Sequence, residues 1–244
     1  SRQGRMATRR AANTAANTRF GRLISGAGRW SRRALLGVLI FWAVAVLAYA
    51  VIAPPTTPYI VSEGVRLGGV QRQWVPMDRI SPAMARAAVA AEDANFCLHW
   101  GFDMGAIRAA LADGAVRGAS TISQQTVKNV YLWQGRSWPR KALEAVLTPA
   151  VEAVWSKRRI LEVYLNVAEF GEGVFGVEAA ARRYFGIAAA DLDADRAARL
   201  AVLLPDPKGR SPLRLSPALG RRAAAIRDGA ATIRADGRAA CFDS

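Results

Sequence analysis

Apolar positions recur with helical spacing along most of this chain after residue 78. Ser81-Pro82 combines a helix N-cap with proline at the first helical position, and the alanine-rich sequence that follows predicts a helix to about Ala91. The same reasoning predicts a helix that starts at Ser120 or Thr121 and contains Asn129, and helices at 104–113, 139–154, 157–166, 177–185, 195–204 and 217–233. No stretch after residue 75 alternates convincingly with a period of two, so this part should be almost wholly helical.

The most apolar run of the chain, residues 34–53, contains no charged residue. Twenty helical residues span about 30 Å, the thickness of the hydrocarbon core of a bilayer. The run therefore predicts one membrane-spanning helix. A cleaved signal peptide is the alternative, but its apolar region has only about 7 to 15 residues, and Pro54-Pro55 stands where small residues would mark cleavage.

Positive charge is concentrated before this helix. The chain has 34 Lys and Arg against 19 Asp and Glu, and nine of the Arg lie in residues 1–33, which contain no acidic residue. An Arg-rich flank stays in the cytoplasm by the positive-inside rule, so residues 54–244 are expected on the other side of the membrane. Beside a membrane helix, the tail is better explained by topology or anionic lipid than by nucleic-acid binding.

These patterns divide the chain into four expected parts. They are a cytoplasmic Arg-rich tail (1–33), a transmembrane helix (34–53), a linker that is irregular or forms a short extended segment (54–77), and a helical domain (78–244). Two cysteines, Cys97 and Cys241, lie far apart in the sequence. An exported domain permits a disulfide between them, but the sequence leaves open whether they meet.

Glu92 is the first candidate for proton transfer. It ends the mostly apolar run Met84 to Ala91, and a poorly solvated carboxylate has a raised pKa suited to a general base near neutral pH. Asp93, next to it, is expected to anchor the local turn instead. The only histidine, His99, is expected to be a structural hydrogen-bonding group, because no second His or Cys pair accompanies it as a zinc site would require.

A polar helix follows this carboxylate pair. Thr121 and Gln124 have the spacing of a capping box. Gln124 and Lys128 share one face of the predicted helix, as do Gln125 and Asn129, because residues four apart are neighbours on a helix. Side chains suited to sugar hydroxyls and phosphate therefore project together.

Five motifs, in the same order, resemble those of the peptidoglycan glycosyltransferases, and most closely the monofunctional biosynthetic transglycosylases. They are Glu92-Asp93-x-x-Phe96-x-x-His99-x-Gly101-Phe102-Asp103, Gly118-Ala-Ser120-Thr121-Ile122-Ser123-Gln124-Gln125 with Lys128-Asn129, Arg140-Lys141-x-x-Glu144, Lys157-x-x-Ile160-Leu161-Glu162-x-Tyr164-Leu165-Asn166, and Phe170-Gly171-x-Gly173-x-x-Gly176 with Ala179-Ala180-x-x-x-Tyr184-Phe185-Gly186. The departures are small: Ser123 stands where Thr is frequent in the family, and Cys97 fills a variable position.

The resemblance implies a mainly α fold, a lysozyme-like helical head with a smaller membrane-proximal jaw, at 78–244. It implies polymerisation of lipid II into glycan strands at the inner membrane, with the catalytic domain in the periplasm and no transpeptidase activity. The implied partners are lipid II, the nascent glycan strand and the bilayer, with other cell-wall synthesis and division proteins as candidates and no nucleic acid. Trp133 or Trp138 is expected on the lipid-facing jaw.

The resemblance also implies roles for single residues. Glu92 is the base, and Glu144 is catalytic, either by holding cations or by helping to bind a divalent ion, Mg²⁺ or Mn²⁺, that bridges the diphosphate. No organic cofactor is expected. The implied substrate-binding residues are Ser120, Thr121, Gln124, Gln125, Lys128, Asn129, Arg136 and Arg140.

Two other functions are compatible with parts of this pattern. A lytic enzyme of lysozyme-like fold would use Glu92 as an acid, but it would not need the cations Lys128 and Arg136 for a diphosphate. A non-enzymatic scaffold of the cell-wall machinery would keep the fold but need not keep Glu92, Lys128, Arg136 and Glu144 together.

Overall fold

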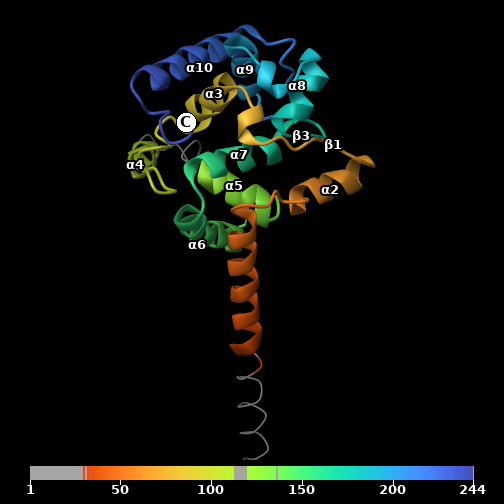
Figure 1. Ribbon diagram of the computed structural model, residues 1–244, viewed down its shortest axis with the longest axis vertical. Coiled ribbons are helices and arrows are strands. Elements are labelled where there is room, and N and C mark those ends of the chain that lie inside the picture. The colour runs from red at the N-terminus through yellow and green to blue at the C-terminus, as the bar shows by residue number, and fades with distance from the viewer. Residues whose placement is uncertain (1–29, 31, 113–119, 136, 244) are drawn as a thin grey trace, which may run out of the picture. The chain divides into compact units, whose positions relative to one another are not determined.

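The computed structural model describes residues 30, 32–112, 120–135 and 137–243, which form two compact units, 1–48 and 49–244 (Figure 1). An apolar helix covers Arg32–Tyr49, and it is long and apolar enough to cross a membrane. The helix ends at Tyr49, four residues before the expected end. An N-terminal apolar helix followed by a mainly helical unit agrees with the fold class expected from the sequence.

The second unit is built mainly of helices (Figure 1). In chain order, its elements are α2 (Pro58–Leu67), β1 (Gln71–Arg72), η1 (Met77–Arg79), α3 (Pro82–Glu92), α4 (Met104–Ala112), α5 (Ile122–Tyr131), α6 (Trp138–Val154), α7 (Lys157–Val167), β2 (Glu169–Gly171), β3 (Val174–Phe175), α8 (Val177–Phe185), η2 (Ala189–Asp191), α9 (Ala194–Ala201) and α10 (Pro217–Ala235).

Local sequence signals place the helix starts. The side chains of Ser81, Ser156 and Ser216 each accept a hydrogen bond from a backbone N–H in the first turn of α3, α7 and α10. The capping box predicted at Thr121 and Gln124 is present at the start of α5. The starts predicted for these four helices are therefore confirmed to within about two residues.

Two groups of helices build the core. α10 lies across α3, and both pack on α9, while α5 packs between α6 and α7 (Figure 1). Large side chains buried in these contacts include Met84 on α3, Tyr164 on α7 and Leu200 on α9. Glu92 is the last residue of α3, so the packing of α3 against α9 and α10 fixes the position of this catalytic candidate.

The structure also contains a small sheet that the sequence did not predict. Its strand order is β1-β3-β2, with β1 parallel and β2 antiparallel to β3. Strands of two or three residues are too short to show a period of two, so tertiary pairing forms them without a sequence signal. Gly176, which follows β3, has φ +86°, and a Cβ atom there would lie 2.9 Å from the Asn166 carbonyl oxygen.

The segment 54–77, expected to be an irregular or short extended linker, contains the short strand β1 and also the helix α2, which was not expected. Thr57 caps α2, since its side chain accepts a hydrogen bond from the Ile60 N–H at 3.2 Å, and Pro58 occupies the first helical position. Proline and glycine in this segment suggested a linker, but Pro58 is the first residue of this helix and Gly68, in a left-handed conformation, ends it.

Candidate active site

Glu92 is the last residue of α3 and is half-buried. Its Oε2 accepts a hydrogen bond of 2.9 Å from the Gln125 amide of α5. Burial raises the pKa of the Glu92 carboxyl, and the raised pKa is only partly offset by the Gln125 hydrogen bond and by the positive charges of Arg222 and Lys128; the neighbouring Asp93 raises it further. The environment is therefore the one predicted for a general base.

Asp93 holds the turn that follows. One carboxylate oxygen lies 2.8 Å from His99 Nε2, and the other accepts a 3.0 Å hydrogen bond from the Ile122 N–H at the start of α5. A carboxylate at a helix N-terminus is favoured by the helix dipole. Asp93 and His99 are thus both structural, as the sequence predicted.

Thr121 and Gln124 are buried in the same junction. The Thr121 hydroxyl donates to the Gly101 carbonyl at 2.7 Å, and the Gln124 side chain accepts from the Thr121 N–H at 3.1 Å. Ser120 is exposed. Ser120 and Thr121 line a hollow of about 250 Å³ together with Glu92. The hollow leaves room for a substrate group beside the Glu92 carboxylate, and contact of Ser120 and Thr121 with the substrate stays a prediction.

Lys128 lies on α5, three residues after Gln125. It is half-buried, and burial lowers the pKa of its ammonium group, while the charges of Glu144 and Glu92 act in the opposite direction. Lys128, Gln125 and Asn129 line a cavity of about 210 Å³. Gln125 therefore lines the cavity of Lys128 and also donates a hydrogen bond to Glu92, which lines the other hollow.

Among the other residues that line the Lys128 cavity are three with ionisable side chains that the sequence did not single out as site residues. They are Tyr59 of α2, Tyr164 of α7 and Glu169 of β2. The Tyr59 hydroxyl donates a short hydrogen bond to Glu169 Oε2, and Glu169 Oε1 accepts from the Gly173 N–H at 3.0 Å. Tyr164 had a signal, since it lies within a family motif, whereas Tyr59 lies in the segment interpreted as a linker.

Glu144 forms a buried ionic group on α6. Its carboxylate accepts from Arg140 Nη1 at 2.9 Å and from the Lys141 ammonium group. The Arg140 and Glu144 side chains are 10% and 4% exposed, so this is no ordinary solvated i,i+4 pair. Arg136, predicted to bind the diphosphate, lies outside the described residues.

The fit of a divalent ion to Glu144 is limited. Within the described residues 32–112, 120–135 and 137–243, no group of three His, Cys, Asp or Glu side chains could hold a metal. Both Glu144 oxygens already accept from cationic side chains. Carboxylate and phosphate oxygens suit Mg²⁺ or Mn²⁺, but this carboxylate alone does not form a resident metal site.

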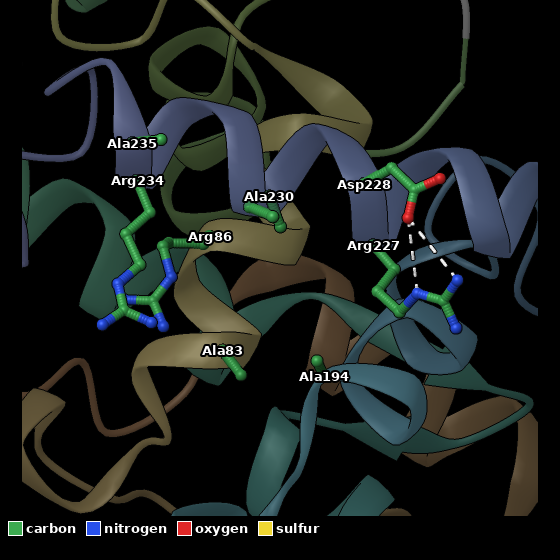
Figure 2. A pocket seen from close by; sticks show the side chains of 9 residues that line it. Ala83, Arg86, Ala194, Arg227, Asp228, Ala230, Arg234 and Ala235 are labelled. Carbon is green, nitrogen blue, oxygen red and sulfur yellow. Dashed lines mark hydrogen bonds and ion pairs between the residues drawn. The ribbon is translucent and has the colours of Figure 1, made fainter.

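A larger hollow, about 500 Å³, lies elsewhere, between α3, α9 and α10. Figure 2 shows Ala83, Ala194 and Ala230 around it, with Arg86 and Arg234 on one side. None of the predicted site residues lines it. We therefore place the candidate site at the smaller hollows that contain Glu92 and Lys128, and not at this larger one.

Burial of the Glu92 charge predicts a pH-dependent effect on stability. A folded-state pKa above the unfolded value means that the folded protein binds more protons between the two values, so stability falls as pH rises through the folded pKa. We expect Glu92→Gln to unfold at a higher urea concentration than the wild type at pH 7, with the difference vanishing below about pH 4. Equal midpoints at both pH values would contradict this.

The Arg140–Glu144 pair predicts a separable effect. Removing one partner of a buried ion pair costs about 3 to 5 kcal/mol, whereas replacing both by neutral groups is often nearly neutral. We expect Glu144→Gln to be strongly destabilised and Arg140→Met/Glu144→Gln to recover most of the loss in urea unfolding. If the pair also acts in the reaction, the double variant stays inactive; recovered activity would make the pair structural only.

The chain is similar to known proteins over the region that contains these site residues. Residues 62–230 match the family described as Transglycosylase. The chain is 59% identical over 235 residues to a "Biosynthetic peptidoglycan transglycosylase" of Jannaschia sp. (strain CCS1), covering 96% of this chain and 98% of that protein. It is 50% identical over 190 residues to proteins of the same name from Yersinia pestis (strain Pestoides F) and Yersinia pseudotuberculosis serotype I (strain IP32953), covering 73% of this chain and 79% of each. The matched region contains Glu92, Lys128 and Glu144.

Proposed function

The chain belongs to the peptidoglycan transglycosylases and is a peptidoglycan glycosyltransferase, and from that premise we propose that it polymerises lipid II. In this reaction the growing lipid-diphosphate-linked chain is transferred to the GlcNAc 4-hydroxyl of a lipid II molecule. Configuration at the anomeric carbon inverts, a β-1,4 linkage forms, and polyprenyl diphosphate leaves.

The observation that carries the proposal is that Gln125 donates to the base Glu92 and lines one cavity with the cation Lys128, and that the two charged groups lie close enough to act on each other. Glu92 accepts the proton of the attacking hydroxyl as the new C–O bond forms. The anomeric C–O bond to the diphosphate breaks, its electron pair leaves with the diphosphate, and Lys128 offsets the charge that develops there. Hydrolysis of glycan would not require the partly buried ammonium group of Lys128.

The test uses the detergent-solubilised full chain. It is incubated with labelled lipid II and, separately, with labelled polymeric glycan, and the products are separated by size. We expect strands to grow from lipid II and the polymer to stay intact. Shortening of the polymer without growth of new strands would replace this function with a lytic one.

We also propose a single-pass arrangement, with residues 1–33 in the cytoplasm and residues 54–244 outside the inner membrane. The support is one helix of sufficient length and apolarity and the Arg-rich sequence before it. Trp133 and Trp138 are 47% and 89% exposed, which suits contact with lipid. Protease added to intact spheroplasts should digest the large domain; full protection would contradict the topology.

We also propose that a divalent ion takes part in the reaction, but only as an ion that the substrate brings with it. It would arrive with the diphosphate and compete with Lys141 for the Glu144 carboxylate, because Glu144 offers no free oxygen. The test is strand synthesis in EDTA, followed by addition of Mg²⁺ or Mn²⁺. Unchanged synthesis in EDTA would remove the ion from the reaction.

A further inference from the structure

The turn that follows Glu92 is held by a segment distant in sequence. Residues 93–101 contain no helix or strand, and Cys97 within them forms a disulfide with Cys241, after the end of α10, with 5.7 Å between the Cα atoms. Arg238 Nη1 also donates to the Ala94 carbonyl at 3.3 Å. The segment after α10, residues 236–243, is therefore attached to the turn at two points.

Aromatic packing continues this attachment into the core. Phe96 of the turn is fully buried, and its ring centre lies 6.3 Å from that of Phe242. The Lys157 ammonium group lies 4.5 Å from the Phe96 ring centre on another side. Asp243 accepts from Arg86 of α3 at 2.7 Å, so the segment bridges the turn and the helix that carries Glu92.

The same turn sets the relative position of the two helices that form the site. Its first residue, Asp93, accepts from the Ile122 N–H at the start of α5, and its last, Gly101, accepts from the Thr121 hydroxyl. Gly101 has φ +84°, and a Cβ atom there would lie 2.7 Å from Thr148 Cγ2 of α6. A shift of the turn therefore changes the distance between Glu92 at the end of α3 and Gln125 on α5.

We propose that Cys97, Cys241 and Phe242 are positioning residues for glycan transfer: the disulfide and the packed ring fix the turn so that Glu92 stays in place against α5. This inference rests on the proposed function. The three residues do not touch the substrate. They act through Asp93 and Phe96 on the geometry of the base.

The main test compares the wild type with Cys97→Ser/Cys241→Ser, which leaves no single thiol. Lipid II consumption is measured at saturating and at limiting lipid II, at a temperature where circular dichroism shows both proteins folded. We expect the maximal rate of the variant to fall at least about tenfold, because a 1 Å misplacement of reacting groups costs up to about a hundredfold, while its KM changes less than about threefold.

A second readout separates positioning from stability. Glu92 is surrounded by Asp93 on its own chain segment, Gln125 and Lys128 of α5, Tyr164 of α7 and Arg222 of α10. If the loosened turn exposes Glu92 to water, the acid limb of the pH–rate profile moves toward the ordinary glutamate value in the variant. Loss of stability alone does not move this limb.

Two controls accompany the variant. Treating the wild type with a phosphine reductant should reproduce both changes, and the same treatment should not affect the double Ser variant. Leu192→Ala, a buried residue after η2, removes stability away from the turn and should keep the acid limb and the maximal rate.

The alternatives have distinct results. Wild-type protein that does not polymerise lipid II would defeat the proposed function itself. Polymerising wild type together with a folded double Ser variant of unchanged rate and pH profile would overturn this inference alone. If the double variant does not fold, Phe242→Leu, which keeps the disulfide, decides: a slower rate with a shifted acid limb supports positioning, and an unchanged profile overturns it.

Discussion

Glu92→Gln is expected to lower the rate of glycan strand growth by roughly a thousandfold, within the range that a general base contributes. The amide keeps the size of the side chain and can still accept from the Gln125 amide, so the fold and the hydrogen bond at 2.9 Å should persist. What is lost is the ability to take a proton from the attacking hydroxyl. Strand growth from labelled lipid II, at saturating substrate, measures the effect.

The matched control for this variant is Asp103→Asn. Asp103 lines the same hollow of about 250 Å³, but its carboxylate accepts from the Ala106 N–H at 2.9 Å and caps α4. Neutralising it should change the rate less than about threefold, since asparagine is about as good an N-cap as aspartate and its side-chain oxygen can still accept from the Ala106 N–H. A Glu92→Gln protein that is folded and retains more than a tenth of the wild-type rate would rule out Glu92 as the base.

The pH dependence gives an independent check on the same group. A base must be deprotonated to act, and burial raises the pKa of Glu92 above its ordinary value. The wild-type ratio kcat/KM should therefore fall on the acid side around a pKa clearly above the ordinary value of about 4.3. An acid limb at or below that value would contradict a buried base.

Lys128→Met should produce the second largest effect, a loss of about a hundredfold in kcat/KM. Methionine keeps much of the length and apolar surface of lysine but removes the charge, and deleting one preorganised group that stabilises developing charge typically costs about 2.7 to 4 kcal/mol. Lys128 is half-buried and lies close enough to Glu144 and Glu92 for both charges to act on it. The measurement is lipid II consumption at limiting substrate.

Lys128→Arg and Arg196→Met complete this experiment. The Arg variant keeps the charge and should recover part of the rate. Arg196 lies on α9, pairs with Asp193 and lies 5.9 Å from the Phe185 ring centre, with its side chain 45% exposed. Removing its charge tests the effect of a lower net charge outside the candidate site and should leave kcat/KM unchanged. Equal losses in Arg196→Met and Lys128→Met would reduce the role of Lys128 to general electrostatics.

Local signals in the sequence were sufficient for most helices. The caps at Ser81, Thr121, Ser156 and Ser216 satisfy backbone N–H groups within a few residues of themselves, so their effect does not depend on distant parts of the chain. The apolar run at 34–53 is equally local, because a bilayer selects length and apolarity. These features could be predicted before any fold was known.

The candidate site was predicted only in part. Glu92, Gln125 and Lys128 were expected together because family motifs contain them. In the structure, Gln125 donates a hydrogen bond to Glu92, and the Lys128 charge acts on Glu92. Tyr59 and Glu169 were missed, since they meet across 110 residues and neither lies in a motif used to predict the site. The role of Arg136 stays a prediction.

The sequence by itself therefore determined the helices, the membrane-span candidate and the residue types needed for the chemistry, because each follows from neighbours in the chain or from the bilayer. Only the tertiary structure decided that Cys97 meets Cys241, that Asp93 accepts a hydrogen bond at the start of α5, and that Tyr59 meets Glu169. Such pairings depend on how helices pack, and packing is a sum over many weak contacts between distant residues that no short pattern encodes.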